Sequence, residues 1–381
     1  MKTFDVAVVG GGIIGASVAF ELAAEKLRVV VLDRQEPGKE ASWAAAGMLS
    51  PAPDSPRDFP LVPLGSESLK LYPEFVAAVE EASGKTTGYA RKGALEIFPA
   101  PGGEVQRDRR VAECRSLGIS AEPVSLSTAR EWEKAIGPAA RAAAWLPEEG
   151  TVEPRLLIDA VLTAARYRGV EVRPNCGVTS IVFEHDVCTG LVAGGDEIAA
   201  GRVVIAAGCF SCAVASETSL LSQYVPTRPV RGQLIALRPE GVCLRRVLRS
   251  EHGYLVPRRD GRVVAGSTSE EAGFNKSVTP AGMRQVLEAA LELSPNLAGA
   301  EVLETWAGLR PGTPDDLPIL GPTDIQGLLI ATGHFRNGIL LAPVTAKLVR
   351  DWIVDGRSKI DTAAYSPMRF AHSKMRARGA R

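Results

Sequence analysis

The sequence predicts an α/β protein with two domains: a Rossmann-like domain assembled from separate stretches of the chain, and an α+β domain with a mixed sheet. Continuous apolar runs, typical of strands buried on both faces, occur near the start, in the middle and near the end, at Val6–Val9, Val203–Gly208 and Leu328–Ala331. The two stretches between these runs have more β character. A length of 381 residues suits two domains.

Composition and charge argue against several classes of protein. Hydrophobic residues make up 45% and charged residues 23%, which is ordinary for a globular chain and argues against disorder. Lys and Arg number 44, as do Asp and Glu, so the net charge of zero argues against a nucleic-acid binder. No apolar run reaches the roughly 18 residues of a membrane span. Asp5 and the glycines after it argue against an N-terminal secretory signal.

The N-terminal stretch predicts a strand, a tight turn, a helix and a second strand, which together make a parallel βαβ unit. After the strand Val6–Val9, small and apolar residues recur at helical spacing over residues 15–23. A second apolar run follows at Arg28–Asp33, and the turn between strand and helix carries the pattern G-x-G-x-x-G at Gly10–Gly15.

The glycines of this turn have separate physical tasks. Gly10 allows the tight turn, Gly12 lets the backbone approach a pyrophosphate, and Gly15 lets helix and strand pack closely. The helix N-terminus offers free N–H groups to phosphate. Asp33 ends the second strand, where an acid hydrogen-bonds ribose hydroxyls. The turn therefore predicts dinucleotide binding, with an unused α/β turn as the alternative.

Helical and strand patterns continue along the chain. Helices are expected at 66–82, 106–117, 127–136, 156–168, 279–293 and 338–354. Strands or extended segments are expected at 93–98, 170–172, 179–182, 203–208, 233–237, 253–257, 262–266, 301–309 and 328–331. Residues 51–63 predict a surface loop, and residues 369–381 a solvated end. The dinucleotide-binding domain is expected to comprise 1–84, 146–215 and 316–381, and the substrate-binding domain 85–145 and 216–315.

Two further segments bear on which dinucleotide binds. No second G-x-G-x-x-G occurs, which suggests one tightly held FAD or an NAD enzyme. Residues Ala41–Leu49 are mostly small, so their backbone can pass close to a large planar ligand, which favours FAD; an ordinary helix start is the alternative. At Ala331–Leu340 a strand ends and a helix begins, and that helix N-terminus could stabilise negative charge on a reduced flavin. The alternative is a capped helix with Pro343 in its first turns.

Four segments together make the chain similar to the FAD-dependent D-amino-acid oxidase family and, within it, to the glycine oxidases of thiamin biosynthesis. They are the fingerprint Gly10–Gly15 with Asp33 and Arg34, the stretch Ala41–Leu49, the stretch Trp306–Pro311 and the stretch Gly333–Pro343. Many flavoproteins share the fingerprint, whereas the other three segments together are far more specific. All four follow the family's order and span nearly the whole chain.

The resemblance implies roles for individual residues. Besides Gly10, Gly12 and Gly15, non-covalent FAD would be lined by Ile13, Ile14, Asp33, Arg34, Ala41, Ser42, Ala46, Gly47 and Met48, with Val178 at the adenine end. The isoalloxazine would be wrapped by His334, Phe335, Arg336, Asn337, Gly338, Ile339 and Leu340. Arg310 and Tyr254 would anchor the substrate carboxylate, and His252, Arg336 and Met48 would face the substrate pocket.

Arg310 also stands out on physical grounds, because it sits in an apolar predicted strand. A buried guanidinium needs an anionic partner, and a bidentate carboxylate is the natural one. An internal salt bridge to Asp315 or Asp316 is the alternative. Tyr254 could add a hydrogen bond to the same carboxylate, and His252, two residues earlier on one expected strand, would face the pocket unless it is an ordinary core or surface histidine.

Several features depart from the family pattern or remain open. Trp43 is bulkier than the small polar residue expected beside Ser42. Relatives that link FAD covalently use a late cysteine, and none follows Cys243, so the flavin is expected to be non-covalent. Cys209 and Cys212 form a C-x-x-C at an expected helix start, where a redox pair is conceivable but not favoured. The four histidines show no zinc-ligand spacing, so no metal is expected.

The resemblance implies oxidative deamination of glycine and other small amines, by hydride transfer to flavin N5 without an obligatory side-chain base. Glyoxylate, ammonia and hydrogen peroxide would result, or the imine would pass to thiamin thiazole synthesis. Six scattered cysteines suit a reducing cytoplasm, and relatives suggest a homotetramer, with a thiazole synthase as candidate partner. The alternatives are a D-amino-acid or sarcosine oxidase, a dehydrogenase, a subunit of a membrane-associated, cyanide-forming glycine dehydrogenase, and a non-catalytic FAD-binding subunit.

Overall fold

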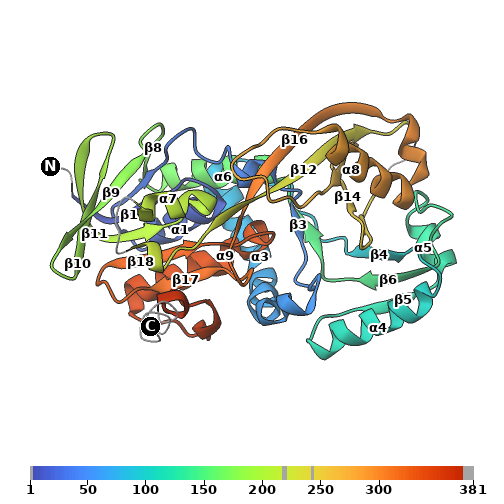
Figure 1. Cartoon of the computed structure of the whole chain (residues 1–381), viewed down its shortest axis with the longest axis horizontal. Helices are drawn as coiled ribbons and strands as arrows, with labels where there is room; N and C mark the ends of the chain where they lie inside the picture. The colour runs from blue at the N-terminus through green and yellow to red at the C-terminus, as the bar shows by residue number, and fades with distance from the viewer. Residues whose placement is uncertain (1–2, 217–220, 242–243, 372–381) are drawn as a thin grey trace, which may run out of the picture.

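The architecture is mixed α/β, built on two large sheets that lie at opposite ends of an elongated molecule (Figure 1). The computed structural model describes residues 3–216, 221–241 and 244–371. Each large sheet has eight strands, and a two-stranded ribbon, β3 (Met48–Leu49) with β7 (Gly150–Thr151), lies between them. This confirms the predicted fold class. The tail residues 372–381 lie outside the described part of the chain, as does Cys243.

The first sheet has a parallel centre in the order β17-β18-β11-β1-β2-β8, with the hairpin β9–β10 added beside β11. Its strands are β1 (Thr3–Val9), β2 (Val29–Leu32), β8 (Glu171–Arg173), β9 (Val178–Glu184), β10 (Val187–Ala193), β11 (Asp196–Ile205), β17 (Ile319–Pro322) and β18 (Leu328–Thr332). Strands β1, β2, β11 and β18 pair in parallel. Their side chains are buried on both faces, which explains the continuous apolar runs.

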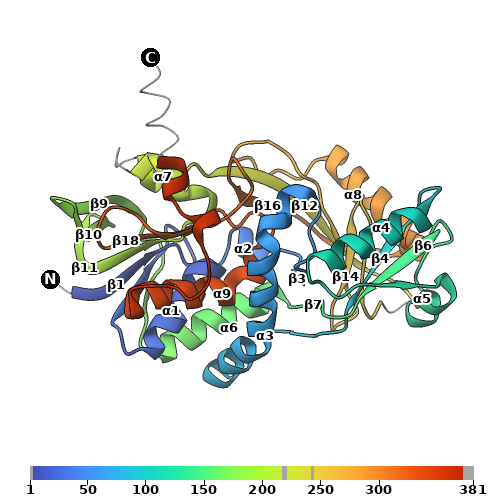
Figure 2. The ribbon, with the colours of Figure 1, turned by 90° about the horizontal axis from the view of Figure 1, so that it is seen from below.

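Helices cover one face of this sheet, as Figure 2 shows for α1, α3, α6 and α9. They are α1 (Ile13–Ala24), α3 (Val62–Ser83), α6 (Pro154–Tyr167) and α9 (Gly338–Arg350), and α9 continues as a π-helical turn over Asp351–Asp355. Of the short helices, α2 (Ala41–Ala44) contacts the second sheet, and α7 (Ser211–Ser216) contacts β9 of the first. The common core of these elements includes Leu22, Tyr72 and Leu157.

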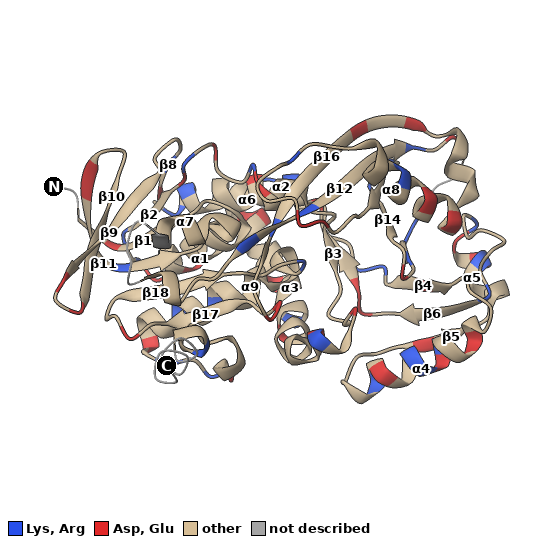
Figure 3. Ribbon diagram, in the orientation of Figure 1, with Lys and Arg blue, Asp and Glu red and all other residues tan. Residues whose placement is uncertain are grey.

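The second sheet is mixed and follows the order β16-β12-β15-β14-β13-β4-β6-β5. Its strands are β4 (Ala94–Phe98), β5 (Glu122–Val124), β6 (Ala142–Leu146), β12 (Arg228–Arg238), β13 (Val247–Arg249), β14 (Tyr254–Pro257), β15 (Val263–Gly266) and β16 (Glu301–Gly312). Helices α4 (Gly103–Ser116), α5 (Leu126–Trp132) and α8 (Pro280–Leu293) accompany it. Acidic and basic residues alternate along α4, and in Figure 3 both signs of charge are spread over the chain.

Strands β12 and β16 are the longest pair and run antiparallel along the edge of the second sheet toward the first (Figure 1). Their register places Val230 opposite Arg310 and Gly232 opposite Gly308. Because alternate residues of a strand share one face, all four of these residues face the same side of the sheet. This face of the sheet therefore carries the side chain of Arg310 next to two glycines, Gly232 and Gly308, which have no side chains.

Some local expectations were wrong. Residues 51–63 are not a continuous loop, because Pro56–Leu61 form a 3-10 helix and Pro63 lies in the first turn of α3. The helix expected at 127–136 ends at Trp132. His252 is not on the strand with Tyr254, because β14 begins at Tyr254 and His252 lies in the preceding bend.

Helix α9 contains Pro343, which has no N–H for the carbonyl of Ile339 four residues earlier. Helix α3 satisfies that carbonyl: the buried hydroxyl of Tyr72 donates to the oxygen of Ile339 at 2.9 Å. Ser68 donates to the neighbouring carbonyl of Leu340 at 2.6 Å. Two side chains of α3 thus supply hydrogen bonds to carbonyls in the first turn of α9, the helix that borders the cavity described below.

Among the described residues, no helix combines the length and the apolar character that crossing a bilayer requires.

Replacing Tyr72 with Phe should lower the free energy of unfolding by about 1–3 kcal/mol, because the Ile339 carbonyl stays buried without a donor. Urea unfolding followed by far-UV circular dichroism measures the change. Tyr167→Phe, at a tyrosine that is 75% exposed, is the control and should match the wild type. Equal stability of both variants would mean that α3 does not support α9 in this way.

Candidate functional site

A single cavity of about 1190 Å³ extends from the glycine-rich turn of the first sheet to the inner face of the second. Ligand pockets of small-molecule enzymes usually measure roughly 300–1,000 Å³, so there is room for a dinucleotide and a small substrate together. Of the predicted site residues, all line this cavity except Gly15 and Leu340, which are buried beside it.

The glycine-rich turn is packed so tightly that only glycine fits. Gly10 has a φ of +103°, and a Cβ there would lie 2.6 Å from the carbonyl oxygen of Ala206. A Cβ on Gly15 would lie 1.9 Å from the carbonyl oxygen of Gly10. Helix α1 therefore starts directly against β1, and its N-cap residue Gly12 has no side chain to cap the first turn. The N–H of Ile13 donates to the hydroxyl of Ser42 at 2.8 Å, and the remaining N–H groups of that turn are suited to a phosphate.

Asp33 at the end of β2 holds the turn from the other side. Its carboxylate accepts hydrogen bonds from the backbone N–H groups of Gly11 at 2.8 Å and of Gln35 at 3.0 Å. Burial raises the pKa of Asp33, and the two backbone donors oppose that rise. The carboxylate is thereby fixed where an acid binds ribose hydroxyls.

The small-residue segment is anchored through its backbone carbonyls. Trp306 donates its indole N–H to the carbonyl of Ala44 at 3.0 Å, and Arg258 donates to that of Ala46 at 2.7 Å. Gly47 has a φ of +81°, and a Cβ there would lie 2.2 Å from the carbonyl of Val152. The segment thus follows one fixed path along the cavity wall.

Trp43 does not enter the cavity. Its ring meets Trp306 edge to face at 6.4 Å, and the guanidinium of Arg155 lies 3.5 Å from the Trp43 ring centroid. Arg155 in turn forms a bidentate ion pair with Glu304 at 2.8 and 2.9 Å. The Trp43 side chain therefore connects α2 to β16, and the side of the segment that lines the cavity keeps its small side chains.

The turn between β18 and α9 forms the opposite wall. Phe335 has a φ of +46°, and its N–H donates to the carbonyl of Pro311 at 3.0 Å, which ties this turn to β16. His334 is buried, and its Nε2 lies 3.0 Å from the hydroxyl of Thr345. Burial lowers the pKa of His334 to about 3, so its imidazole is neutral at physiological pH. The first turn of α9, at Gly338 and Ile339, faces the cavity with its N–H groups.

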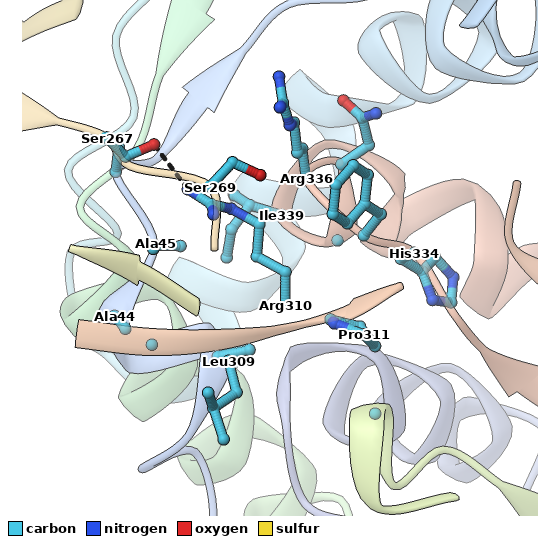
Figure 4. Close-up of a pocket in the computed structure, with 18 of the residues that line it drawn as sticks. Ala44, Ala45, Ser267, Ser269, Leu309, Arg310, Pro311, His334, Arg336 and Ile339 are labelled. Carbon is cyan, nitrogen blue, oxygen red and sulfur yellow. Dashed lines mark hydrogen bonds between the residues drawn. The ribbon is translucent and has the colours of Figure 1, made fainter. Parts of the chain in front are cut away.

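Arg310 rises from β16 into this cavity toward Ser267 (Figure 4). Its guanidinium donates to the hydroxyl of Ser267 at 2.6 Å and to the carbonyl of Thr268 at 3.0 Å. No Asp or Glu in the described part of the chain forms an ion pair with it. Burial lowers the pKa of Arg310, with Tyr254 opposing that shift.

The internal salt bridges that could have explained Arg310 are formed by other residues. Asp315 pairs with Arg369 at 2.8 Å, and Asp316 lies 3.5 Å from Arg228. A half-buried guanidinium whose hydrogen-bond partners are all neutral is well suited to an anionic ligand. Its remaining N–H groups can bind a carboxylate in the bidentate manner that arginine favours.

A second arginine of the cavity wall shows the contrast. Arg249 is 8% exposed, and it pairs with Glu96 at 2.9 Å and with Glu149 at 3.1 Å. Although burial raises the pKa of Glu96, Arg249 and Arg110 hold it below its usual value. The charge on Arg249 is compensated inside the protein, whereas that on Arg310 is left for a ligand.

Space for the Arg310 side chain comes from Gly232 on the neighbouring strand. A Cβ on Gly232 would lie 2.3 Å from Nη1 of Arg310 and 2.5 Å from its Cζ. On the same face, a Cβ on Gly308 would lie 2.4 Å from the Cβ of Ala44. The guanidinium lies flat against β12, beside the backbone of the small-residue segment.

Tyr254, His252 and Arg336 all line the cavity, but they make different contacts. Tyr254 lines the cavity and interacts with the Arg310 guanidinium. His252 is exposed at the cavity edge, and its Nδ1 lies 2.8 Å from Glu292, which raises the pKa of the imidazole. Arg336 is exposed and pairs with Asp54 at 2.9 Å. The roles predicted for His252 and Arg336 stay predictions.

Sequence reasoning missed the residues that position Arg310. Ser267, Thr268 and Gly232 were not identified as site residues, although a glycine inside an apolar strand is a known sign of a close approach. Asp54 lies in a segment expected to be only a loop, and nothing in the sequence indicates its pairing with Arg336.

The two cysteines of the C-x-x-C motif are not bridged in the structure. Cys209 and Cys212 are both free, and Cys212 donates to the carbonyl of Cys209 at 3.3 Å. Burial raises the pKa of Cys209 to about 12, which makes the thiol unreactive. No cluster of metal-ligating side chains is found in the ranges that the structure describes.

Comparisons with known proteins agree on one family. A family profile described as FAD dependent oxidoreductase matches residues 5–352. The glycine oxidase of Pseudomonas putida is 32% identical over 370 residues, which cover 95% of this chain and 98% of that protein. The crystal structure of glycine oxidase from Geobacillus kaustophilus superposes with a TM-score of 0.89 at 32% identity, covering 96% of this chain and 98% of that one.

Other relatives are longer proteins. The bifunctional protein ThiO/ThiG of Synechocystis sp. is 37% identical over 376 residues, which cover 97% of this chain but 54% of that protein. The chain thus spans about half the length of the bifunctional relatives that it matches.

Gly232→Ala should weaken the binding of simple carboxylates, such as acetate, by about tenfold or more, because the new methyl group displaces the Arg310 guanidinium. The perturbation of the flavin absorbance spectrum on titration with acetate measures the affinity. Gly299→Ala, where a Cβ meets nothing within 4 Å, is the control. Unchanged affinity in Gly232→Ala would show that the guanidinium does not need this position.

His334 should make the protein less stable in acid. Its pKa in the folded state is about 3, below the usual 6.5, so the unfolded chain binds the proton first as pH falls. The destabilisation begins near pH 6.5, grows by at most about 1.4 kcal/mol per pH unit, and levels off near pH 3. Thermal unfolding between pH 4 and 8 should therefore show a flatter profile for His334→Gln. His185→Gln, at an exposed histidine, should keep the wild-type slope, and equal slopes for all three proteins would contradict the assignment.

Proposed function

Since the chain belongs to the FAD dependent oxidoreductase family and is an FAD-dependent enzyme, we propose that it oxidises glycine and other small amino acids or amines. The family membership confirms the resemblance that the motifs indicated. The observation that carries the proposal is Arg310, a half-buried cation in the cavity whose described hydrogen-bond partners are neutral. A carboxylate on the substrate would complete its contacts.

The residues that would hold FAD follow from the tight turn and the anchored wall. The N-terminus of α1 would bind the pyrophosphate, Asp33 the ribose, and the segment Ala41–Met48 the flavin ring. FAD would be held without a covalent bond. When bound, it supplies the two-electron acceptor for the Cα–H bond of the substrate.

The chain's own residues would orient the substrate. Arg310 binds the carboxylate through two parallel hydrogen bonds, and Tyr254 adds a third from its hydroxyl. With the carboxylate fixed, the Cα–H of a small amino acid is directed toward the wall formed by Ala44 and Ala46. Orientation of this kind lowers the barrier mainly by removing translational and rotational freedom before the reaction.

The electrostatics of the site would keep the substrate amine unprotonated. The charge on Arg310 disfavours a second positive charge beside it, since like charges oppose ionisation. His334 is neutral and buried against Thr345, so it adds no charge. The ring of His252 pairs with Glu292 at the cavity edge, which leaves the mechanism without a side-chain base at the reacting carbon.

The balanced reaction converts glycine, dioxygen and water to glyoxylate, ammonia and hydrogen peroxide. The Cα–H bond gives up two electrons and one proton, and the amine nitrogen gives up a second proton, which leaves an imine. Water hydrolyses the imine to glyoxylate and ammonia, and dioxygen takes up the two electrons and two protons as hydrogen peroxide. The bifunctional ThiO/ThiG relatives favour a role in thiamin biosynthesis, in which the imine is used for thiazole synthesis with a separate partner protein. We place the enzyme in the cytoplasm as a homotetramer.

An anaerobic titration of the holoenzyme tests this function. Glycine should bleach the flavin absorbance, and air should restore it with release of hydrogen peroxide. Sarcosine, D-alanine and D-proline are the comparison substrates, because they differ from glycine only in bulk at nitrogen or Cα. Bleaching by the bulkier amines alone would reject glycine as substrate. Bleaching that air does not reverse would identify a dehydrogenase, and no bleaching by any of them would indicate a non-catalytic FAD-binding subunit.

A further inference from the structure

A loop of the second sheet crosses to the nucleotide end of the cavity. It comprises residues 271–278, between β15 and α8, and we call it the strap. Its sequence reaches from the Ser267–Glu270 turn, which contacts Arg310, to Thr279, the N-cap of α8. None of the functions considered so far requires contacts at its tip.

The base of the strap is closed by one buried side chain. The amide of Gln233 donates to the carboxylate of Glu270 at 2.7 Å and accepts from the N–H of Thr279 at 2.7 Å. Gln233 is fully buried. Glu270 also pairs with Arg231 through both backbone hydrogen bonds, at 2.8 and 2.9 Å, and through the two side chains. Both ends of the strap are therefore fixed to β12.

The tip of the strap contacts the other domain at two points. The ring of Phe274 stacks on that of Phe210, with centroids 5.1 Å apart and an interplanar angle of 22°. The ammonium of Lys276 lies 3.1 Å from the carboxylate of Glu40. Phe274 is nevertheless 52% exposed.

The residues that the tip contacts line the nucleotide end of the cavity. Phe210 and Glu40 are both part of its wall, and Arg34 joins them there. The guanidinium of Arg34 lies 3.4 Å from the centroid of the Phe210 ring and pairs with Glu40 at 3.0 Å. Arg34 directly follows Asp33, the acid at the ribose position. The strap thus ends on the group of side chains that borders the adenosine half of the site.

We propose that the strap retains FAD by clamping this end of the site. Phe274 and Lys276 hold Phe210 and Glu40 in place, and those residues hold Arg34 against the bound nucleotide. Since the base of the strap is fixed, the clamp needs no closing movement, and its effect falls on the rate at which FAD leaves. The flavin ring would be held at the other end of the cavity, by the segment Ala41–Met48, so its environment should not depend on the strap. The inference does not rest on glycine as the substrate.

The release of FAD from the holoenzyme tests the clamp. Diluted holoenzyme is followed by the rise of flavin fluorescence, and its visible spectrum and thermal midpoint are recorded beforehand. Phe274→Ala should release FAD about tenfold faster, since the ring stack is lost, with the spectrum unchanged and the midpoint lowered only as far as the weaker binding of FAD requires. Phe274→Tyr, which keeps the ring, should restore the wild-type rate. Tyr167→Ala, at an exposed tyrosine far along α6, controls for loss of an aromatic side chain.

Lys276→Gln removes the ion pair and leaves the ring, so it tests the strap independently. It should release FAD about twofold faster at low salt and at the wild-type rate at high salt, because exposed ion pairs are weak and screened. Wild-type release rates in both Phe274→Ala and Lys276→Gln would overturn the proposal. A changed flavin spectrum in Phe274→Ala would also overturn it, because the strap would then act on the flavin end.

Discussion

A half-buried guanidinium with only neutral hydrogen-bond partners is the constraint on which the arrangement of this site depends. A charge that is shielded from water and has no opposite charge beside it lowers the stability of the folded protein, so the position of Arg310 calls for a ligand that compensates it. Gly232 on the neighbouring strand has no side chain and so makes room for the guanidinium. The hydroxyl of Ser267 and the carbonyl of Thr268 accept hydrogen bonds from it. The carboxylates that could neutralise it, Asp315 and Asp316, are engaged elsewhere. The site is therefore complementary to an anion before any ligand is present.

The same strand pair links this anion site to the cofactor site. Ala44 packs on Gly308 in β16, and the indole of Trp306 binds the carbonyl of Ala44, so the wall that faces the flavin is fixed to the strand that carries Arg310. On β12, Gln233 anchors the base of the strap whose tip reaches the nucleotide end. The proposed sites for cofactor and substrate thus belong to one connected set of contacts, which suits a reaction that depends on positioning.

The parts of the fold that the sequence could predict are those set by local rules. Buried parallel strands such as Val6–Val9 are continuous apolar runs, and the Gly10–Gly15 turn follows from close approach of backbone to ligand. The position of Arg310 in an apolar strand was likewise visible. Non-local contacts were not. The pairing of His252 with Glu292 and the direction of the Trp43 ring depend on which distant elements pack beside them, and no local pattern encodes that.

The central claim is that Arg310 selects substrates by their carboxylate. The most direct measurement compares glycine with glycinamide, which keeps the amine and the Cα–H but has no negative charge, in anaerobic reduction of the bound flavin. Wild-type enzyme should require roughly a hundredfold or more glycinamide for the same rate, in line with the 2–5 kcal/mol of an unpaired buried charge. In Arg310→Met the two compounds should become nearly equivalent. Equal reactivity of glycine and glycinamide with the wild-type enzyme would contradict the account.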